Sequence, residues 1–199
     1  LVESLKIIEN IIKTYNIDGD ICEFGVAQGK TSKLMSYLIK NSEKKIFLFD
    51  SFQGLPKASK QDILKDDIFN LGTIEKYEGK MAHSETKVIE ELNSIKFDLS
   101  KVIINKGFFN KENLHKFKFP SSIAFAYVDF DYYQPTLDVL NSIENKLQIG
   151  SVIIIDDYDF FSTGAKTAVD EWMQSRKDIF QINFIKTLNS SFAIINKMK

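Results

Sequence analysis

The sequence has little of what disulfide staples, flexible linkers or membrane spans require. A single Cys among 199 residues cannot form an intramolecular disulfide, which excludes a disulfide-stapled secreted domain. With 3 Pro and 9 Gly, the chain is not linker-rich. The longest apolar runs, residues 123–128 and 152–155, are far shorter than the ~20 residues of a membrane span. We therefore predict a cytoplasmic protein without a membrane-embedded segment.

Net charge is also nearly absent. The 26 Lys+Arg balance 27 Asp+Glu to a formal net charge of −1, which gives no general attraction to nucleic acid or to an anionic membrane and leaves only a local basic patch open. The 44% of hydrophobic residues exclude a disordered chain, and the length suits one domain over residues 1–199. Because residue 1 is Leu, we expect that the start Met and an N-terminal segment are missing.

Short β-rich runs alternate with helical patterns along the chain. The predicted strands are residues 21–24, 45–49, 101–104, 123–128, 152–155, 182–185 and 192–195. The predicted helices are 5–15, 31–39, 83–95, a helix from Pro135 through Leu147 that Gly150 ends, and 165–173. This alternation of apolar strands and helices predicts a doubly wound α/β fold with a mostly parallel sheet. A short turn at Asn189-Ser190 joins the last two strands, which must form an antiparallel edge pair.

Residues 51–80 are the least regular part of the chain, with four glycines or prolines and scattered charges. A stretch of that length without periodicity is usually functional, so we expect a lid or a substrate-binding loop.

The turn after the first strand carries the pattern Gly25-x-x-x-Gly29. Two glycines before a helix let the backbone approach a ligand, although an ordinary tight turn is an equal alternative. The pattern differs from Gly-x-Gly-x-x-Gly, which disfavours a nicotinamide dinucleotide. Asp50 ends the second strand 21 positions after Gly29, where an acidic residue accepts hydrogen bonds from ribose hydroxyls. Together the two features favour a ligand that contains ribose.

Three acidic residues follow two neighbouring apolar strands. Asp129 follows residues 123–128, and Asp156 and Asp157 follow residues 152–155. Carboxylates gathered at one sheet edge repel each other unless a cation or shared protons neutralise them, and oxygen ligands suit Mg²⁺. The alternative is that some of these acids cap helices, as we expect for Asp131 before Pro135. In the turn after the third strand, Phe108 and Phe109 either stack on an adenine or pack in the core.

Six motifs occur in the order typical of one known family. They are Glu23-Phe24-Gly25-Val26-x-x-Gly29-Lys30-Thr31, Phe49-Asp50-Ser51-Phe52-x-Gly54-Leu55-Pro56, Gly107-Phe108-Phe109, Asp129-x-Asp131-x-Tyr133-x-Pro135-Thr136, Asp156-Asp157-Tyr158 and Gly164-Ala165-x-x-Ala168-Val169-Asp170-Glu171. From about residue 18 to the end, the chain resembles the macrocin O-methyltransferase family, which are S-adenosylmethionine-dependent sugar methyltransferases of antibiotic pathways and their relatives.

The resemblance implies a Rossmann-like class I methyltransferase fold with a seven-stranded sheet. It implies that S-adenosylmethionine is the cofactor and that the residues around it are Glu23, Gly25, Thr31, Asp50, Ser51, Gly107 and Phe108. It also implies that Asp129, Asp156 and Asp157 bind Mg²⁺, as in the related catechol-type enzymes.

The general base differs between branches of these enzymes. Catechol-type enzymes carry a Lys three residues after the first metal-binding Asp, and Tyr132 occupies that position here. In the sugar-modifying branch an Asp of the metal cluster takes the role, which points to Asp156, with Asp129 beside it among the catalytic residues. His83 is the other candidate base, although a lone exposed His is more often structural.

The resemblance therefore implies Mg²⁺-dependent methyl transfer from S-adenosylmethionine to a hydroxyl of a sugar or a glycosylated small molecule. The alternatives are O-methylation of a phenolic or catechol-like metabolite or a lipid head group, and an inactive homologue that only binds the cofactor. A nucleic-acid substrate is disfavoured because Asp-Phe-Asp-Tyr follows the fourth strand rather than Asn-Pro-Pro-Tyr. We expect a small-molecule partner, neither nucleic acid nor membrane, and a homo-oligomer is the assembly that many family members adopt.

Overall fold

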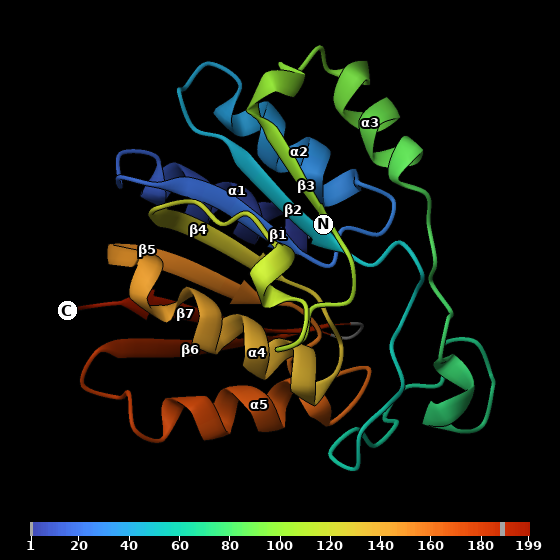
Figure 1. The fold of residues 1–199 in the computed structure, drawn as a ribbon. Helices are drawn as coiled ribbons and strands as arrows, with labels where there is room; N and C mark the ends of the chain where they lie inside the picture. Colours follow the sequence, from blue (N-terminus) through green and yellow to red (C-terminus); the bar gives the residue numbers. More distant parts are fainter. Residues whose placement is uncertain (1, 188–189) are drawn as a thin grey trace.

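The computed structural model describes residues 2–187 and 190–199, which form one α/β unit (Figure 1). Its helices are α1 (Val2–Thr14), α2 (Lys30–Ile39), α3 (Glu85–Ser94), α4 (Tyr133–Ile143) and α5 (Gly164–Met173). Its strands are β1 (Asp20–Phe24), β2 (Ile46–Asp50), β3 (Val102–Lys106), β4 (Ile123–Val128), β5 (Leu147–Ile155), β6 (Phe180–Lys186) and β7 (Ser191–Lys197). No helix in this described part of the chain combines the length and the apolar character needed to cross a membrane.

The seven strands form one sheet in the order β3-β2-β1-β4-β5-β7-β6. β1 to β5 pair in parallel, whereas β7 runs antiparallel to both of its neighbours. Strand order therefore reverses between β1 and β4, as expected for a doubly wound sheet. The prediction of a mostly parallel sheet with an antiparallel edge pair is confirmed; Asn189 of the predicted turn lies outside the described residues.

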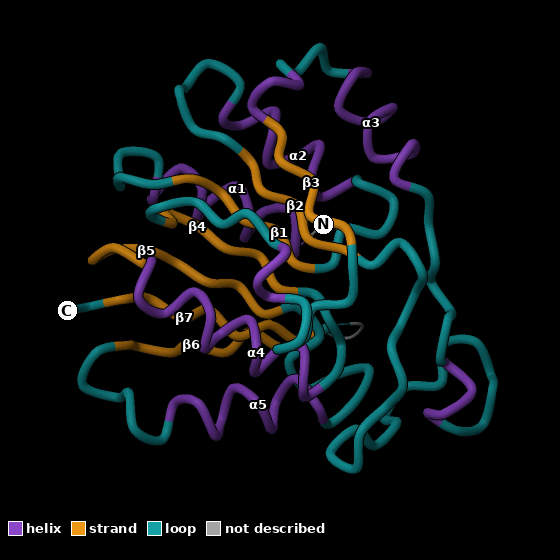
Figure 2. The backbone as a smooth tube through the Cα atoms, viewed as in Figure 1, coloured by secondary structure: helices purple, strands orange, loops and turns teal. Residues whose placement is uncertain are grey.

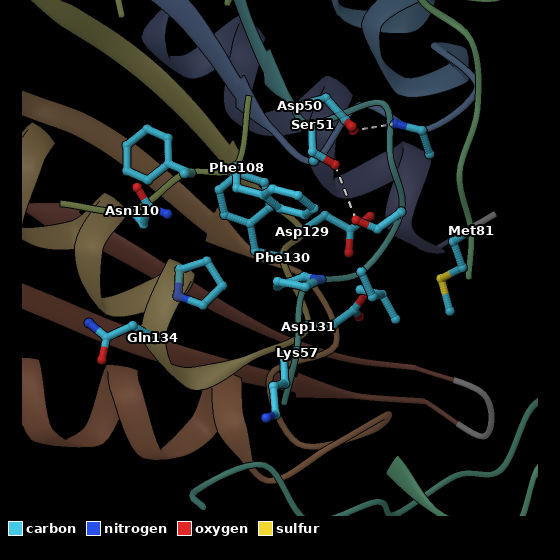
Figure 3. A pocket seen from close by; sticks show the side chains of 17 residues that line it. Asp50, Ser51, Lys57, Met81, Phe108, Asn110, Asp129, Phe130, Asp131 and Gln134 are labelled. Atoms are coloured by element: carbon cyan, nitrogen blue, oxygen red, sulfur yellow. Dashed lines mark hydrogen bonds between the residues drawn. The ribbon is translucent and has the colours of Figure 1, made fainter. Parts of the chain in front are cut away.

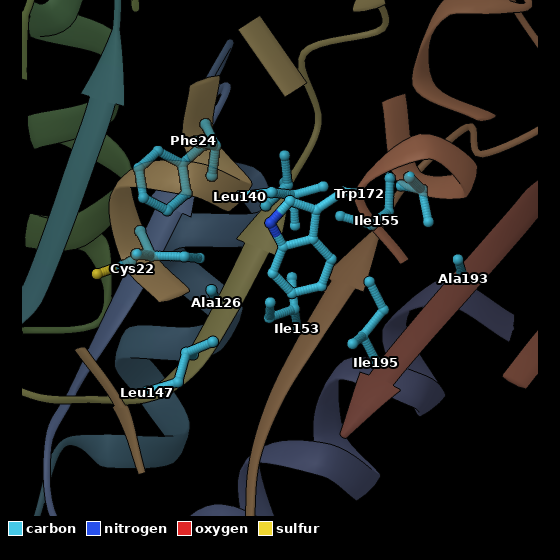
Figure 4. Packing of buried hydrophobic residues seen from close by; sticks show 14 of the residues in the cluster. Cys22, Phe24, Ala126, Leu140, Leu147, Ile153, Ile155, Trp172, Ala193 and Ile195 are labelled. Atoms are coloured by element: carbon cyan, nitrogen blue, oxygen red, sulfur yellow. The ribbon is translucent and has the colours of Figure 1, made fainter. Parts of the chain in front are cut away.

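Helices cover both faces of the sheet. Residues of α1, α2 and α3 pack on one face and those of α4 and α5 on the other, so each face has its own apolar core. On the α4/α5 face the Trp172 ring is 2% exposed and lies over Ile153 and Ile155 of β5 (Figure 4). This two-sided burial explains why β4 reads as an unbroken apolar run, since all six of its residues are buried.

The predicted end of the fourth helix is wrong. α4 stops at Ile143, a 3-10 turn follows at Glu144–Lys146, and Leu147 begins β5 instead of extending the helix. Gly150 lies within β5 at φ +88°, where the pairing with β4 shifts register. A glycine tolerates this left-handed backbone conformation, so it marks a strand irregularity rather than a helix end.

Residues 51–80 form an arm that extends from the carboxyl end of β2 along one side of the unit (Figure 2). Its regular structure is limited to a 3-10 turn at Ile74–Tyr77 and an isolated bridge between Leu64 and Ser162. Tyr77 packs in a small apolar cluster with Tyr132 and Phe161, which precede α4 and α5. The arm is therefore irregular, as predicted, but it is anchored to the body.

Candidate functional site

A pocket opens at the carboxyl ends of the parallel strands, beside the point where strand order reverses (Figure 3). Three groups of residues line it. The strand ends contribute Gly25, Ala27, Asp50, Ser51, Asp129, Phe130 and Asp131; the turn after β3 contributes Phe108, Phe109 and Asn110; and the arm, the residue after it and α4 contribute Gly54, Leu55, Pro56, Lys57, Met81, Gln134 and Pro135. This is the place where doubly wound sheets bind their ligands.

Gly25 brings the first turn into direct contact with the end of β4. Its φ is +88°, and a Cβ at this position would lie 2.0 Å from the carbonyl oxygen of Asp129. The Gly25 N–H donates to the Phe49 carbonyl at 2.9 Å, which ties the same turn to β2. A side chain at residue 25 would push these strand ends apart, so the glycine is required by contact as well as by conformation.

Asp50 closes the glycine turn from the end of β2. Its Oδ2 accepts hydrogen bonds from the backbone N–H groups of Val26 at 2.7 Å and Ala27 at 3.0 Å. Its Oδ1 accepts from the Phe52 N–H at 2.6 Å. A carboxylate offers about four lone-pair sites, so one remains for a ribose hydroxyl. Ser51 follows Asp50 in the lining, and its hydroxyl donates to the Gly54 carbonyl at 3.1 Å.

The two phenylalanines after β3 take different roles. Both line the pocket, but Phe109 is only 5% exposed and packs edge-on against Phe24 with ring centroids 5.3 Å apart. Gly107 lies outside the lining, and its N–H donates to the Asp50 carbonyl at 2.9 Å. Of the three residues in this motif, Phe108 is therefore the one placed to stack on a ring.

Asp129, Asp131, Asp156 and Asp157 gather where β4 and β5 end. Burial, followed by repulsion from Asp156, raises the pKa of Asp131 to about 7, and the same causes raise that of Asp157 to about 8. Burial also raises the pKa of Asp129 well above its usual range. Among the described residues, none of the ion pairs brings a cation to these acids. Burial and mutual repulsion therefore favour the protonated form of these carboxyl groups.

Tyr127 connects this cluster to the N-terminal helix. Its hydroxyl lies 2.5 Å from Asp156 Oδ2 and 2.9 Å from Glu3 Oε1, and the tyrosine is 1% exposed. A phenol has one proton, so it can donate to only one of the two carboxyl groups at a time. Glu3 is a site residue that sequence reasoning missed, because no local pattern indicates that α1 reaches the end of β5.

Six of the residues expected at the site lie outside the pocket lining: Gly107, Asp156 and Asp157, described above, and Glu23, Thr31 and His83. Glu23 is 0% exposed; its Oε2 accepts a hydrogen bond from the Ser32 hydroxyl, and its Oε1 has no partner. Thr31 lies in the first turn of α2, and His83 lies on the segment that leads to α3. Lys57 of the arm and Met81, directly after the arm, line the pocket instead, and neither stands in a sequence pattern that indicates chemistry.

Asp131 does not cap α4, which corrects our expectation. The N-cap residue is Tyr132, and its side chain makes no capping bond. The Tyr133 N–H at the start of the helix instead donates to Asp62 Oδ1 of the arm at 2.7 Å. Asp62 is 4% exposed, and Ser59 also donates to it. A residue 71 positions away in sequence therefore takes the capping role, which a local pattern cannot reveal.

The described part of the chain contains no group of three or more His, Cys, Asp or Glu residues arranged to hold a metal ion. Asp156 shows why: its Oδ2 lies against the Tyr127 hydroxyl, and its Oδ1 accepts the Asp157 N–H at 2.9 Å. The carboxylates are close enough to raise one another's pKa, but they do not converge on one point as this structure has them.

Comparison with known proteins shows which families of sequences this chain is similar to. The sequence model described as macrocin O-methyltransferase (TylF) matches residues 2–189. The demethyldecarbamoylnovobiocin O-methyltransferase of Streptomyces niveus is 27% identical over 168 residues, which are 83% of this chain and 62% of that protein. A rhamnosyl-tetracenomycin C 4'-O-methyltransferase of Streptomyces olivaceus is 24% identical over 79% of this chain and 59% of that protein.

The fold has a counterpart among solved structures. The O-methyltransferase NovP superposes with a TM-score of 0.77 at 23% sequence identity, over 99% of this chain and 78% of that one. The chain spans about three fifths of the length of the curated relatives it matches.

Proposed function

Because the chain belongs to the macrocin O-methyltransferase family, we propose that it transfers a methyl group from S-adenosylmethionine to a hydroxyl of a sugar or of a glycosylated small molecule. One observation carries this proposal: Gly25, Asp50 and Asp129, from three different strand ends, meet around one pocket that also has a half-buried aromatic wall. The rhamnosyl group in the name of the Streptomyces olivaceus relative supports a sugar acceptor.

We infer one orientation for the cofactor from the residues that line the pocket. Asp50 is placed to hold the ribose, since it stands at the tip of β2 beside the glycine turn. Phe108 and Phe130 provide apolar surface for the adenine. Gly25 leaves room for the backbone to approach the methionine part. In that orientation the sulfonium methyl would lie toward Asp129 and Asp131, which also line the pocket.

The chemical step needs little from the protein beyond orientation and one proton acceptor. The acceptor hydroxyl loses its proton to a carboxylate, its oxygen forms a bond to the methyl carbon, and the carbon–sulfur bond breaks to release neutral S-adenosylhomocysteine. Asp156, the expected base, lies behind the lining, while its neighbour Asp129 faces the pocket. We therefore assign proton removal to this pair, with orientation supplying much of the rate.

A magnesium requirement is a separate part of the proposal. The donor types fit Mg²⁺, since Asp129, Asp156 and Asp157 supply only carboxylate oxygens. Their present arrangement does not fit, because the described residues form no metal-ligand group.

The test is a methyl-transfer screen with the purified protein. S-adenosylmethionine is offered with TDP-rhamnose, a rhamnosylated tetracenomycin and a catechol, and products are followed by mass spectrometry. We expect a methylated sugar, and we expect the product to vanish in Asp156→Asn while cofactor binding survives. Cofactor binding without any product would favour the inactive-homologue alternative, and methylation of the catechol alone would overturn the sugar assignment.

A further inference from the structure

Tyr127 is a buried polar residue that the proposed chemistry does not yet use. It lies in β4, two residues before Asp129, and its side chain packs in the same apolar core as Phe125. The tyrosine is 1% exposed and lies outside the pocket lining. A phenylalanine ring would fill this space without a polar atom to satisfy, so the Tyr127 hydroxyl requires a partner that accounts for its burial.

The first partner of this hydroxyl is Asp156, which the proposed mechanism pairs with Asp129. The Tyr127 oxygen lies 2.5 Å from Asp156 Oδ2, and the Asp157 N–H donates to Asp156 Oδ1 at 2.9 Å. Ser190 adds a side-chain hydrogen bond to the same carboxyl group. Because both oxygens of Asp156 are held, its carboxyl group cannot turn without breaking a hydrogen bond.

The second partner comes from α1. Glu3 stands in the first turn of this helix, and its Oε1 lies 2.9 Å from the Tyr127 oxygen. Glu3 and Asp156 compete for the single phenol proton, and a Glu3 carboxylate that takes it leaves Asp156 without this donor. A group at position 3 that donates to the phenol oxygen would instead direct the phenol proton to Asp156. The side chain at position 3 therefore decides how firmly Asp156 is held.

We propose that Tyr127 is a positioning residue for methyl transfer: its hydroxyl holds the Asp156 carboxyl group in place beside Asp129, and Glu3 of α1 tunes that hold by competing for the phenol proton. This inference rests on the proposed function and adds two residues to it. Asp129 lines the pocket, whereas Asp156 and Tyr127 lie outside its lining. The hydroxyl therefore acts on the geometry of proton removal and not on the binding of either ligand, so its loss lowers kcat and leaves KM unchanged.

Tyr127→Phe removes the hydroxyl and keeps the ring. The probe is the acceptor that the wild-type protein methylates fastest in the screen above, with saturating S-adenosylmethionine. We expect kcat to fall about 10- to 100-fold, with the acceptor KM and the cofactor Kd unchanged. Tyr158→Phe is the matched control: Tyr158 is 6% exposed and lies outside the pocket lining, and its hydroxyl donates to Asp170 of α5 at 2.5 Å. The control loses an equally short buried hydrogen bond and keeps the wild-type kcat.

Glu3→Gln tests the contact with α1. The Gln amide donates to the phenol oxygen, so the phenol proton stays with Asp156 and kcat stays at or above the wild-type value. Urea unfolding of Glu3→Gln, Tyr127→Phe and the double variant tests the same contact without any substrate. We expect non-additive shifts of the urea midpoint, because two residues in contact share one interaction. Additive shifts, or a kcat of Glu3→Gln as low as that of Tyr127→Phe, would remove Glu3 from this arrangement.

The remaining outcomes separate this inference from the proposed function. If the wild-type protein methylates no acceptor, the proposed function fails and this inference fails with it. If the wild-type protein is active and Tyr127→Phe keeps its kcat, or loses rate only through a higher KM or weaker cofactor binding, this inference alone fails. Equal losses of kcat in Tyr127→Phe and Tyr158→Phe would assign the Tyr127 hydroxyl to the stability of the fold and overturn its positioning role.

Discussion

The Asp50 carboxylate and the Val26 amide are joined by a 2.7 Å hydrogen bond across the glycine turn. The bond links the tip of β2 to the turn after β1, and the Ala27 N–H reinforces it on the same oxygen. Asp50 therefore shapes the cofactor site before any ligand arrives, in addition to the ribose contact that we propose for it.

We expect Asp50→Asn to weaken S-adenosylmethionine binding about 10- to 100-fold, because an amide replaces one of two oxygens that together accept three backbone hydrogen bonds. Isothermal titration measures the change, with Asp178→Asn as the control for removing one negative charge. An unchanged Kd would separate Asp50 from the cofactor.

Gly25→Ala should abolish cofactor binding and destabilise the fold. The new Cβ would lie 2.0 Å from the Asp129 carbonyl oxygen, so β1 and β4 would have to separate at the pocket. Gly79→Ala is the matched control, since Gly79 also has a positive φ, +74°, but no atom lies within 4 Å of its added Cβ. We expect the control to cost about 1–2 kcal/mol from conformation alone, and Gly25→Ala to cost clearly more. Urea unfolding of both variants gives the comparison, and equal losses would contradict the contact argument.

Glu23→Gln should stabilise the protein, increasingly so as pH rises. Burial raises the pKa of Glu23 well above its usual value of 4.5, so its carboxyl is neutral in the folded state at pH values where the unfolded chain carries it ionised. That difference is absent below pH 4.5 and grows above it, by up to about 1.4 kcal/mol per pH unit until the folded carboxyl itself titrates. The Gln amide does not titrate, so the variant does not lose stability in this way as the pH rises.

Melting temperatures of wild type and Glu23→Gln between pH 4.5 and pH 8 measure this effect. The two should nearly coincide at the acidic end and diverge toward pH 8, with the variant melting higher. A difference that is constant with pH would mean that Glu23 is ionised in the folded state. Cofactor titration of the same variant distinguishes this buried role from the methionine contact that the family resemblance implies.

Treatment with EDTA tests the magnesium part of the proposed function. If carboxylates of the acid cluster rearrange to bind Mg²⁺, chelation lowers methyl transfer and added Mg²⁺ restores it, while S-adenosylmethionine still binds through Asp50 and Phe108. Methyl transfer at the full rate in EDTA would contradict the magnesium requirement.

The fold was predictable because its signals are local. Apolar runs such as residues 123–128 are long enough to specify buried strands, and Gly19 and Pro135 mark element boundaries. The predicted helix end at Leu147 and Gly150 was wrong, because the same residue types occur at a helix end and at a strand irregularity. The period of the pattern changes there from helical to extended within a few residues, where periodicity is weakest as evidence.

The site was predictable where one strand end supplies it and unpredictable where distant elements meet. Asp50 and Asp129 could be placed from their strands alone. Glu3 at the cluster and Asp62 at the start of α4 arrive through contacts over 124 and 71 positions, respectively. Sequence patterns describe neighbours along the chain, so partners of this kind need the packed structure.

The contacts of the arm divide it into two parts: a foot around Leu64 and Lys65, and a tip formed by residues 66–78. The foot, around Leu64, is held to the loop before α5 by the Ser162 bridge and by the Lys65 N–H, which donates to the Phe161 carbonyl at 2.9 Å. The tip closes on itself, since the Tyr77 hydroxyl donates to Asp67 at 2.7 Å and accepts from the Phe69 N–H at 3.0 Å. The tip is also packed on the body, since the Tyr77 ring lies 5.1 Å from that of Phe161, so residues 66–78 can be exchanged only as a unit that keeps Tyr77.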